Sequence, residues 1–476
     1  MSRIVVLGGG VCGLAAGILL RRDGHEVTVL ERDPEPVPST VEDAWHRWSR
    51  DGVTQFRQAH YLTSRGRILL EEALPDVLAS LEGANAFPFD PPKIMPPSIT
   101  DRTPRPGDER FPTVNARRAV FEQVLGGFAD AESGLEVRRG VSVAGLLTRA
   151  GNGKPPHVSG VRIDSGEQLA ADLVDDASGR RSQVPRWLEL AGTAPVHEES
   201  EDSGFIYYSR FFRAHNGEMP RFRAGVLTPI GTFSVLTIPS DNDTWSVTIY
   251  TASGDQPLKR LRDPRAWTAV ARSCPAHAQW LDGEPISDLI AMGGILDRYR
   301  RLVVDGTPVA TGVALVGDAW ACTNPSQGRG MTLGLLHAKL LADVLRAHPD
   351  NPRTFAEEFD AVTEAELTPW YRETVEEDRI RLGQIEALRH GLEARAATGS
   401  MAWKLAALAG AMTADADAFR AIVANKACLT LNREIFEDAG LFERILEVAR
   451  QSDPGPPPGP DRDQLLALLD AAPATA

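Results

Sequence analysis

The sequence predicts an α/β fold that opens with a βαβ unit and continues into an inserted β-rich region and a helical C-terminal region. Three observations lead to this prediction. Residues 3–7 form a short apolar run typical of a buried parallel strand, and a second strand pattern covers residues 25–31 after a glycine turn. Residues 200–300 contain several alternating apolar segments, and helical periodicity dominates after Gly328. With 476 residues, the chain is long enough for two or three structural units.

Composition narrows the class of protein. The net charge of −14 argues against a nucleic-acid partner, because phosphate backbones need a basic face. The four cysteines are too far apart in sequence for a redox pair or a clustered metal site, and they fit a reducing, cytoplasmic location. No apolar run is long enough to predict a membrane span, and the apolar start is interrupted by glycines, unlike a signal peptide. The sequence does not specify an oligomeric state.

The remaining elements follow in order along the chain. The pattern predicts helices over 11–22, 61–82 and 117–131, loop over 33–55, loop or edge strand over 84–113, strands over 135–139 and 313–316, and a β-rich stretch over 140–180. Thr354 and Glu357 predict a capping box, and Pro369 predicts a kink in the helix that follows. Two or three helices are expected within 401–448, and a stiff Pro-rich linker, 452–461, precedes a short terminal helix.

The strongest motif is the glycine turn of residues 8–13, Gly-Gly-Gly-Val-Cys-Gly. It fits G-x-G-x-x-G and lies between a predicted strand and a predicted helix, which is the context that this motif requires. Gly8 permits the tight turn, Gly10 lets the backbone approach a pyrophosphate, and Gly13 lets the helix pack on the strand. Glu31 ends the second strand, where a carboxylate can accept hydrogen bonds from ribose hydroxyls. The unit predicts a dinucleotide site, but NAD and FAD share this pattern.

Two later segments favour FAD. Asp318 follows the predicted strand 313–316 in a Gly-Asp pair, and the segment 324–331 (Asn-Pro-Ser-Gln-Gly-Arg-Gly-Met) comes soon after it. The arrangement resembles the second FAD motif of flavoprotein hydroxylases, in which the Asp binds a ribityl hydroxyl and the glycines open a helix that faces the flavin ring. The dipole of such a helix stabilises negative charge on a reduced flavin. Residues 175–182 resemble the middle motif of the same proteins, although alone they also fit an ordinary Asx turn.

The three motifs stand in the order typical of one family, the single-component (group A) FAD-dependent monooxygenases with the aromatic-hydroxylase fold, and the chain resembles that family over residues 3–345. The resemblance implies a glutathione-reductase-like, Rossmann-type FAD-binding domain. Residues 48–60 are similar to the R-x-G-V-P-Q…H segment of bacterial epoxidase-like members, with Thr54 in place of the usual Pro. Arg118 matches the Arg of the family's R-x-x-L-E helix start, which reaches the FAD phosphates.

The resemblance also implies domain boundaries and a set of cofactor contacts. The FAD-binding domain is expected over 1–80, 112–185 and 300–345, the β-rich substrate domain over 81–111 and 186–299, and the helical region over 346–476. The predicted cofactor-binding residues are Gly8, Gly10, Val11, Cys12, Gly13, Glu31, Arg32, Arg50, Arg118, Val143, Asp318, Pro325, Gly328, Gly330 and Met331.

Several further residues have two interpretations. Arg50 and Gln55 either position the reacting groups or hold a loop, and no other catalytic residue is predicted. Tyr208 and Arg210 alternate on one strand and either face a substrate or face solvent. His60 and Cys12 are interpreted as packing residues. Lys93 is at a position that invites comparison with a halogenase lysine, but the halogenase pattern W-x-W-x-I-P is absent.

The function that the resemblance implies is monooxygenation. NAD(P)H, bound transiently, reduces FAD, and a flavin C4a-hydroperoxide transfers one oxygen atom of O₂ to a hydrophobic small molecule, by hydroxylation or epoxidation in specialised metabolism. A flavin-dependent reductase of an isoprenoid-like double bond is the main alternative. A flavin-dependent halogenase and a non-enzymatic escort protein of the same fold are less favoured, because the halogenase pattern is missing and Glu31, Asp318 and the glycines are intact.

Overall fold

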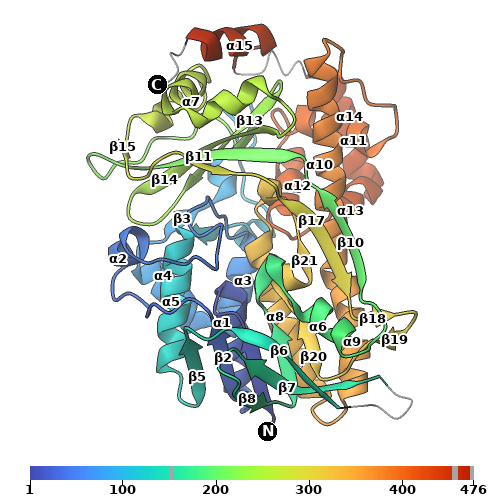
Figure 1. The fold of residues 1–476 in the computed structure, drawn as a ribbon. Helices are drawn as coiled ribbons and strands as arrows, with labels where there is room; N and C mark the ends of the chain where they lie inside the picture. Colours follow the sequence, from blue (N-terminus) through green and yellow to red (C-terminus); the bar gives the residue numbers. More distant parts are fainter. Residues whose placement is uncertain (150–154, 453–458, 472–476) are drawn as a thin grey trace.

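A five-stranded parallel sheet forms the base of the molecule (Figure 1). We describe residues 1–149, 155–452 and 459–471 of a computed structural model of the chain. The strands of the sheet, in spatial order, are β20 (Val313–Leu315), β9 (Leu173–Asp176), β1 (Arg3–Leu7), β2 (Glu26–Glu31) and β5 (Leu135–Arg139). Ile4 to Leu7 of the central strand are all buried, which explains why the sequence there is a continuous apolar run.

Helices of small and apolar residues pack against this sheet. They are α1 (Val11–Arg22), α5 (Arg118–Ala131) and α8 (Gly330–Ala347), and α1 contacts both of the others. Close packing of α1 depends on small residues, since a Cβ atom at Gly17 would lie 3.0 Å from Cγ2 of Val29. An antiparallel sheet, β6 (Val143–Arg149), β7 (His157–Ile163) and β8 (Gln168–Ala170), contributes to the same hydrophobic core. This part of the fold is the predicted Rossmann-type unit, and the predicted fold class is confirmed.

A second sheet, in which all strand pairs are antiparallel, stands above the first in Figure 1. Its order is β12 (Leu227–Ile230), β13 (Phe233–Pro239), β14 (Thr244–Ala252), β11 (Phe205–Arg213) and β15 (Glu284–Pro285), and β16 (Ile290–Met292) also pairs with β11. Alternate residues of its strands pack with α7 (Pro264–Arg272) and α15 (Arg462–Ala471) in a core that includes Trp245 and Trp267. The opposite face is turned toward the cavity described below.

Smaller sheets connect these parts. They are β10 (His197–Asp202), β17 (Leu296–Arg301) and β21 (Ala321–Cys322); β3 (Phe87–Phe89) with β4 (Thr113–Asn115); and β18 (Val303–Val304) with β19 (Thr307–Pro308). The remaining helices of the first half are α2 (Val41–His46), α3 (Ser64–Ala73), α4 (Pro75–Gly83) and α6 (Val184–Leu190).

The C-terminal part is helical, as predicted. Its helices are α9 (Pro352–Glu366), α10 (Thr368–Arg389), α11 (Met401–Ala411), α12 (Ala416–Lys426), α13 (Asn432–Glu437) and α14 (Ala439–Gln451). In Figure 1, α10 to α14 stand beside the second sheet and reach down toward α8 and α9. No helix within the described residues is long and apolar enough to cross a membrane.

Some predicted elements were wrong in detail. The helix expected over 61–82 is two helices, because Pro75 starts α4 and Leu74 leaves the helical region with φ −139° and ψ 56°. The loop expected over 33–55 contains the short helix α2, which is capped by the hydroxyl of Thr40.

The helices after residue 350 also required correction. Thr354 is not a cap: the side chain of Asn351 accepts the hydrogen bond from the backbone N–H of Thr354, and Thr354 lies inside α9. Pro369 does not kink a helix, because α9 has already ended and the proline occupies the first turn of α10, where no N–H donor is needed. Four helices, instead of two or three, lie within 401–451. Residues 453–458 of the predicted linker lie outside the described residues, and the three-unit division of the chain stays a prediction.

Candidate functional site

A cavity of about 830 Å³ extends from the glycine turn to the second sheet and the C-terminal helices. The turn forms one end of it. Gly8 has φ +100°, and a Cβ atom there would lie 2.7 Å from the carbonyl oxygen of Ala177. At Gly10 an added Cβ would have only the guanidinium of Arg118 within 4 Å, so the backbone is open toward the cavity. Gly13 does not line the cavity; its Cβ would lie 1.9 Å from the carbonyl oxygen of Gly8, so its role is packing.

The carboxylate of Glu31 is held in place beside this turn. It accepts hydrogen bonds from the backbone N–H of Gly9 at 2.8 Å and of Asp33 at 2.9 Å, and it lines the cavity. Arg32 also lines the cavity and donates to the carbonyl oxygen of Gly52. The end of β2 therefore presents a fixed acceptor to a ligand lying across the turn.

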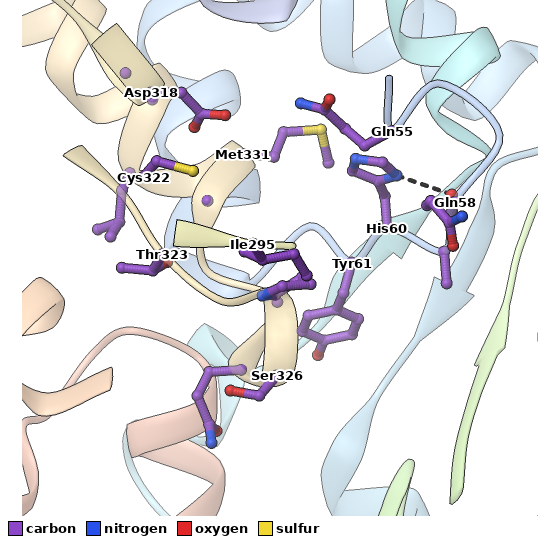
Figure 2. A pocket seen from close by; sticks show the side chains of 18 of the residues that line it. Gln55, Gln58, His60, Tyr61, Ile295, Asp318, Cys322, Thr323, Ser326 and Met331 are labelled. Atoms are coloured by element: carbon purple, nitrogen blue, oxygen red, sulfur yellow. Dashed lines mark hydrogen bonds between the residues drawn. The ribbon is translucent and has the colours of Figure 1, made fainter. Parts of the chain in front are cut away.

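Arg50 lies behind the cavity wall, not in it. Its side chain is 2% exposed, and its Nη2 donates to the carbonyl oxygen of Gly9 at 2.9 Å and to Glu31 at 3.0 Å. Its Nε lies 3.1 Å from a carboxylate oxygen of the fully buried Glu122. Arg50 is therefore not among the residues that line the cavity, and its contacts fit a residue that positions Glu31; its contact with the cofactor stays a prediction. Gln55, in contrast, lines the cavity, opposite Asp318 in Figure 2.

Arg118 and His60 form a fixed pair at the cavity wall. Arg118 donates from Nε to Glu122 at 2.7 Å, and its Nη1 lies 3.2 Å from Nε2 of His60. Burial and the charge of Arg118 lower the pKa of His60 to about 3, so the ring is neutral at neutral pH. Its Nδ1 therefore donates to the carbonyl oxygen of Gln58, the 2.9 Å contact drawn in Figure 2, and its Nε2 accepts from Arg118. The cationic Arg118 is thereby held above the glycine turn.

The second predicted motif lies on the other side of the cavity. After β20, a short 3-10 turn (Gly317–Ala319) places the carboxylate of Asp318 toward the cavity centre in Figure 2. Burial raises the pKa of Asp318, and the guanidinium groups of Arg118 and Arg180 oppose that shift. The chain then continues through a 3-10 turn (Pro325–Gln327) into α8. Pro325, Gly328, Gly330 and Met331 all line the cavity, as do Val11, Cys12 and Val143.

The middle motif supports the same cavity. The carboxylate of Asp176 accepts hydrogen bonds from the backbone N–H of Ser178 and from the hydroxyl groups of Ser178 and Ser182. These contacts fix the loop after β9, and residues 177–181 line the cavity between the glycine turn and Asp318. Burial raises the pKa of Asp175, whose two oxygens have no hydrogen-bond partner among the described residues.

The predicted substrate residues lie on the wrong face of their strand. Tyr208 packs in the core of the second sheet beside Trp267, and Arg210 donates to the carbonyl oxygen of Ser287. Neither lines the cavity. Because side chains alternate along a strand, the residues that do line it come from the neighbouring strands with the opposite orientation: Leu236, Ile238, Tyr250 and Met292.

Sequence reasoning missed the contribution of the C-terminal helices. Tyr371, Asp378, Arg381 and Gln384 of α10 line the cavity, together with an apolar group from α11, α12 and the turn between them: Leu405, Ala406, Ala409, Met412, Phe419, Ile422 and Val423. The apolar spacing of α11 was a usable signal, because residues 405, 409 and 412 share one helical face. Nothing in the sequence indicated which part of the fold that face meets.

The residues of this cavity fit FAD. The open glycine turn at the N-terminus of α1 provides unpaired backbone N–H groups for a pyrophosphate, and Arg118 adds positive charge there. Glu31 lies at the position of a ribose acceptor, and the carboxylate of Asp318 faces the cavity. The described residues contain no group of three His, Cys, Asp or Glu side chains arranged for a metal ion.

Comparisons with known proteins agree with this geometry. Residues 6–63 match the model of the NAD(P)-binding Rossmann-like domain family. Protein Rv3254 of Mycobacterium tuberculosis is 26% identical over 364 residues, which are 72% of this chain and 73% of that protein. Kynurenine 3-monooxygenase of Salinispora tropica is 23% identical and aligns over 75% of each chain.

Solved structures extend the likeness to the whole fold. PqsL, a probable FAD-dependent monooxygenase from Pseudomonas aeruginosa, superposes with a TM-score of 0.58 at 18% identity, covering 81% of this chain and 99% of PqsL. The flavin-dependent brominase Bmp2 shares the fold with a TM-score of 0.58 at 16% identity, covering 94% of this chain and 98% of Bmp2. The fold is therefore similar to the folds of PqsL and Bmp2. The chain is thus similar to FAD-dependent monooxygenases both in sequence and in fold.

Proposed function

We propose that this chain uses FAD, NAD(P)H and O₂ to hydroxylate or epoxidise a hydrophobic small molecule. One observation supports the proposal above the others. The glycine turn, Glu31, Asp318 and the start of α8 meet at the same cavity as an apolar chamber made by the second sheet and the C-terminal helices. A cofactor held by the glycine turn, Glu31 and Asp318 would have its reactive end in the apolar chamber.

The residues of the chain divide the work of binding. The first turn of α1 and Arg118 hold the phosphates, Glu31 accepts the ribose hydroxyls and Asp318 accepts a ribityl hydroxyl. Bound FAD supplies the redox chemistry, reduction by NAD(P)H and activation of O₂. The N-terminus of α8 places backbone N–H groups and a positive dipole end where negative charge develops. The apolar walls exclude water from the reacting groups.

The names of the relatives guide the first choice of substrates. Kynurenine 3-monooxygenase and PqsL, which has been solved in complex with 2-aminobenzoylacetate, both point to small aromatic molecules as the first class to assay. A halogenase function is not favoured, because the side chain of Lys93 is 79% exposed, pairs with Asp90 at 3.1 Å and does not line the cavity.

The test starts with purified protein reconstituted with FAD. NAD(P)H oxidation, oxygen uptake, hydrogen peroxide and product are measured together over an aromatic substrate panel. The proposal expects oxygen-dependent product formation and release of peroxide when no substrate is present. Product formed under strict anaerobiosis would instead favour the double-bond reductase. A protein that stays colourless in excess FAD would overturn both readings and favour an escort protein.

A further inference from the structure

One end of the cavity holds a buried carboxylate that the binding of FAD does not use. Asp378 of α10 lines the cavity with 4% of its surface exposed. Its Oδ1 accepts a 2.7 Å hydrogen bond from the hydroxyl of Ser326. Its Oδ2 has no hydrogen-bond partner among the described residues. An open acceptor of this kind in a ligand cavity is costly unless a ligand supplies the missing donor.

The position of Ser326 relates Asp378 to the cofactor. Ser326 lies in the 3-10 turn that leads into α8, the segment proposed to face the flavin ring. In Figure 2, Ser326 and Tyr61 lie at the end of the drawn cavity away from Asp318, which is proposed to bind the ribityl chain. A group bound to Asp378 would therefore lie on the substrate side of the cofactor.

The walls around Asp378 select the kind of ligand. The sheet contributes Leu236 and Ile238, and α11 and α12 contribute Leu405, Met412 and Ile422, all of them apolar. These side chains favour a ligand with a large apolar body.

Arg381 argues against a cationic ligand; Lys426 also lines the cavity and is paired with Glu377 at 3.0 Å. Arg381 lines the same cavity one helical turn after Asp378. It donates hydrogen bonds to neutral oxygens, the carbonyls of Gly231 and Phe233 and the hydroxyl of Ser234. Its charge would repel an ammonium group, whereas a neutral hydroxyl meets no such penalty.

We propose that Asp378 is the specificity-determining acceptor for a hydroxyl group on an apolar substrate, so that the substrate class is hydrophobic molecules bearing a phenol or alcohol. This inference rests on the proposed function, which places the reacting group of the cofactor in this cavity. It concerns how the substrate binds and not the chemical step. Asp378 accepts the hydroxyl hydrogen bond on Oδ2 while Ser326 holds Oδ1, and the apolar body lies between the sheet and helices α11 and α12.

The pH dependence follows from the surroundings of the carboxyl. Burial raises the pKa of Asp378 to about 7, and the carboxyls of Asp297 and Glu377 add to the shift, against the opposing effect of the polar side chains of Ser326 and Asn324. The phenols of Tyr207 and Tyr250 also face it, and burial raises the pKa of both, so they stay neutral. The charged acceptor is present above pH 7 and lost below it, so hydroxyl recognition should strengthen between pH 6 and pH 8.

The test compares two probes that differ in one donor. Binding of 2-naphthol and of 2-methoxynaphthalene to the FAD-loaded protein is measured by calorimetry and by the change in flavin absorbance. Wild type should prefer the naphthol about tenfold or more, as expected for a hydrogen bond to a charged acceptor. Asp378→Leu should bring the ratio close to one, and Asp378→Asn should keep part of it but lose its pH dependence.

Asp297→Asn is the matched control. Asp297 is a second buried carboxylate beside Asn324 and does not line the cavity. Its replacement should leave the preference intact at pH 8, where Asp378 is ionised in both proteins, and should only shift the pH dependence lower. Equal affinity for both probes in wild type, no binding of either at its solubility limit, or a preference that survives in Asp378→Leu overturns the inference. If the protein selects naphthol through Asp378 but couples no oxygen uptake to product formation, the proposed function is overturned and the inference about Asp378 stands.

Discussion

At the scale of single residues, the cofactor end of the cavity is organised by a chain of buried charges. Arg50 lies between Glu31 and Glu122, and Glu122 in turn holds Arg118. Glu31, which lines the cavity, is therefore held in place by Arg50, which does not. Such ion pairs add little net stability, but removing one partner leaves the other charge buried and uncompensated.

We predict that Arg50→Met lowers the free energy of unfolding by about 3–5 kcal/mol, because Glu31 and Glu122 lose their shared cation. Urea denaturation measures this loss. Arg47→Met is the control: its pair with Asp43 is on the surface, with the arginine 82% exposed, and should change stability by less than about 0.5 kcal/mol. Equal effects of the two substitutions would contradict the positioning role.

Asp318→Ala should weaken FAD binding by roughly 10- to 100-fold, the value of a hydrogen bond to a charged acceptor, without a comparable loss of folding. The carboxylate faces the cavity, and no donor among the described residues depends on it for a hydrogen bond. Flavin content and the thermal midpoint in excess FAD measure the two effects separately. Asp360, a partly buried residue that pairs with Arg301 and does not line the cavity, is a suitable control for alanine replacement. Unchanged FAD affinity would show that the ribityl contact is misplaced.

At the scale of elements, the accuracy of sequence prediction depended on whether a pattern had one physical meaning. The opening strand, the glycine turn and α1 were predicted with correct bounds, because the turn and the buried strand each require particular residues. The face of β11 was not predictable from the strand alone. Both of its faces are buried, so apolar residues stand at odd and even positions, and Tyr208 gave no sign of which side it took.

The start of α9 gives a direct test of an element boundary. Asn351→Ala should destabilise the protein by about 1 kcal/mol, because the side chain accepts from the backbone N–H of Thr354. Thr354→Ala should cost less than about 0.5 kcal/mol, since that residue is inside the helix and caps nothing. Thermal unfolding of the two variants decides between them. A larger loss for Thr354→Ala would restore the capping box that the sequence suggested.

At the scale of the whole molecule, the last third of the chain completes the site. Arg329, just before α8, donates to Glu373 of α10 and Asn425 of α12 at 2.8 and 2.9 Å, so the turn at the start of α8 is tied to the helices that roof the cavity. The sequence correctly predicted that this region is helical. It did not place them, because an apolar helical face indicates burial without naming its partner.

The roof gives a prediction about coupling. Ile422→Ala should raise the fraction of NAD(P)H oxidation that ends as peroxide, because a widened apolar wall admits water to the reacting groups, while FAD content stays unchanged. Val448→Ala is the control, since Val448 packs in the same helical cluster but does not line the cavity. Product, peroxide and NAD(P)H are measured together at a temperature where both variants remain folded. Equal peroxide yields in the two variants would argue against a sealing role for this wall.

The connection between Arg329 and the helices of the last third has a consequence for how the protein is made. A ribosome releases the five strands of the parallel sheet in the order 3–7, 26–31, 135–139, 173–176 and 313–315, yet the partners of Arg329 emerge only at residues 373 and 425. The glycine turn is synthesised first, but the turn before α8, which is proposed to face the flavin, gains these partners only after residue 425 has emerged. We therefore expect stable capture of the cofactor to require the chain up to residue 425, and a nascent chain truncated before it would keep its phosphate cradle without a finished place for the ring.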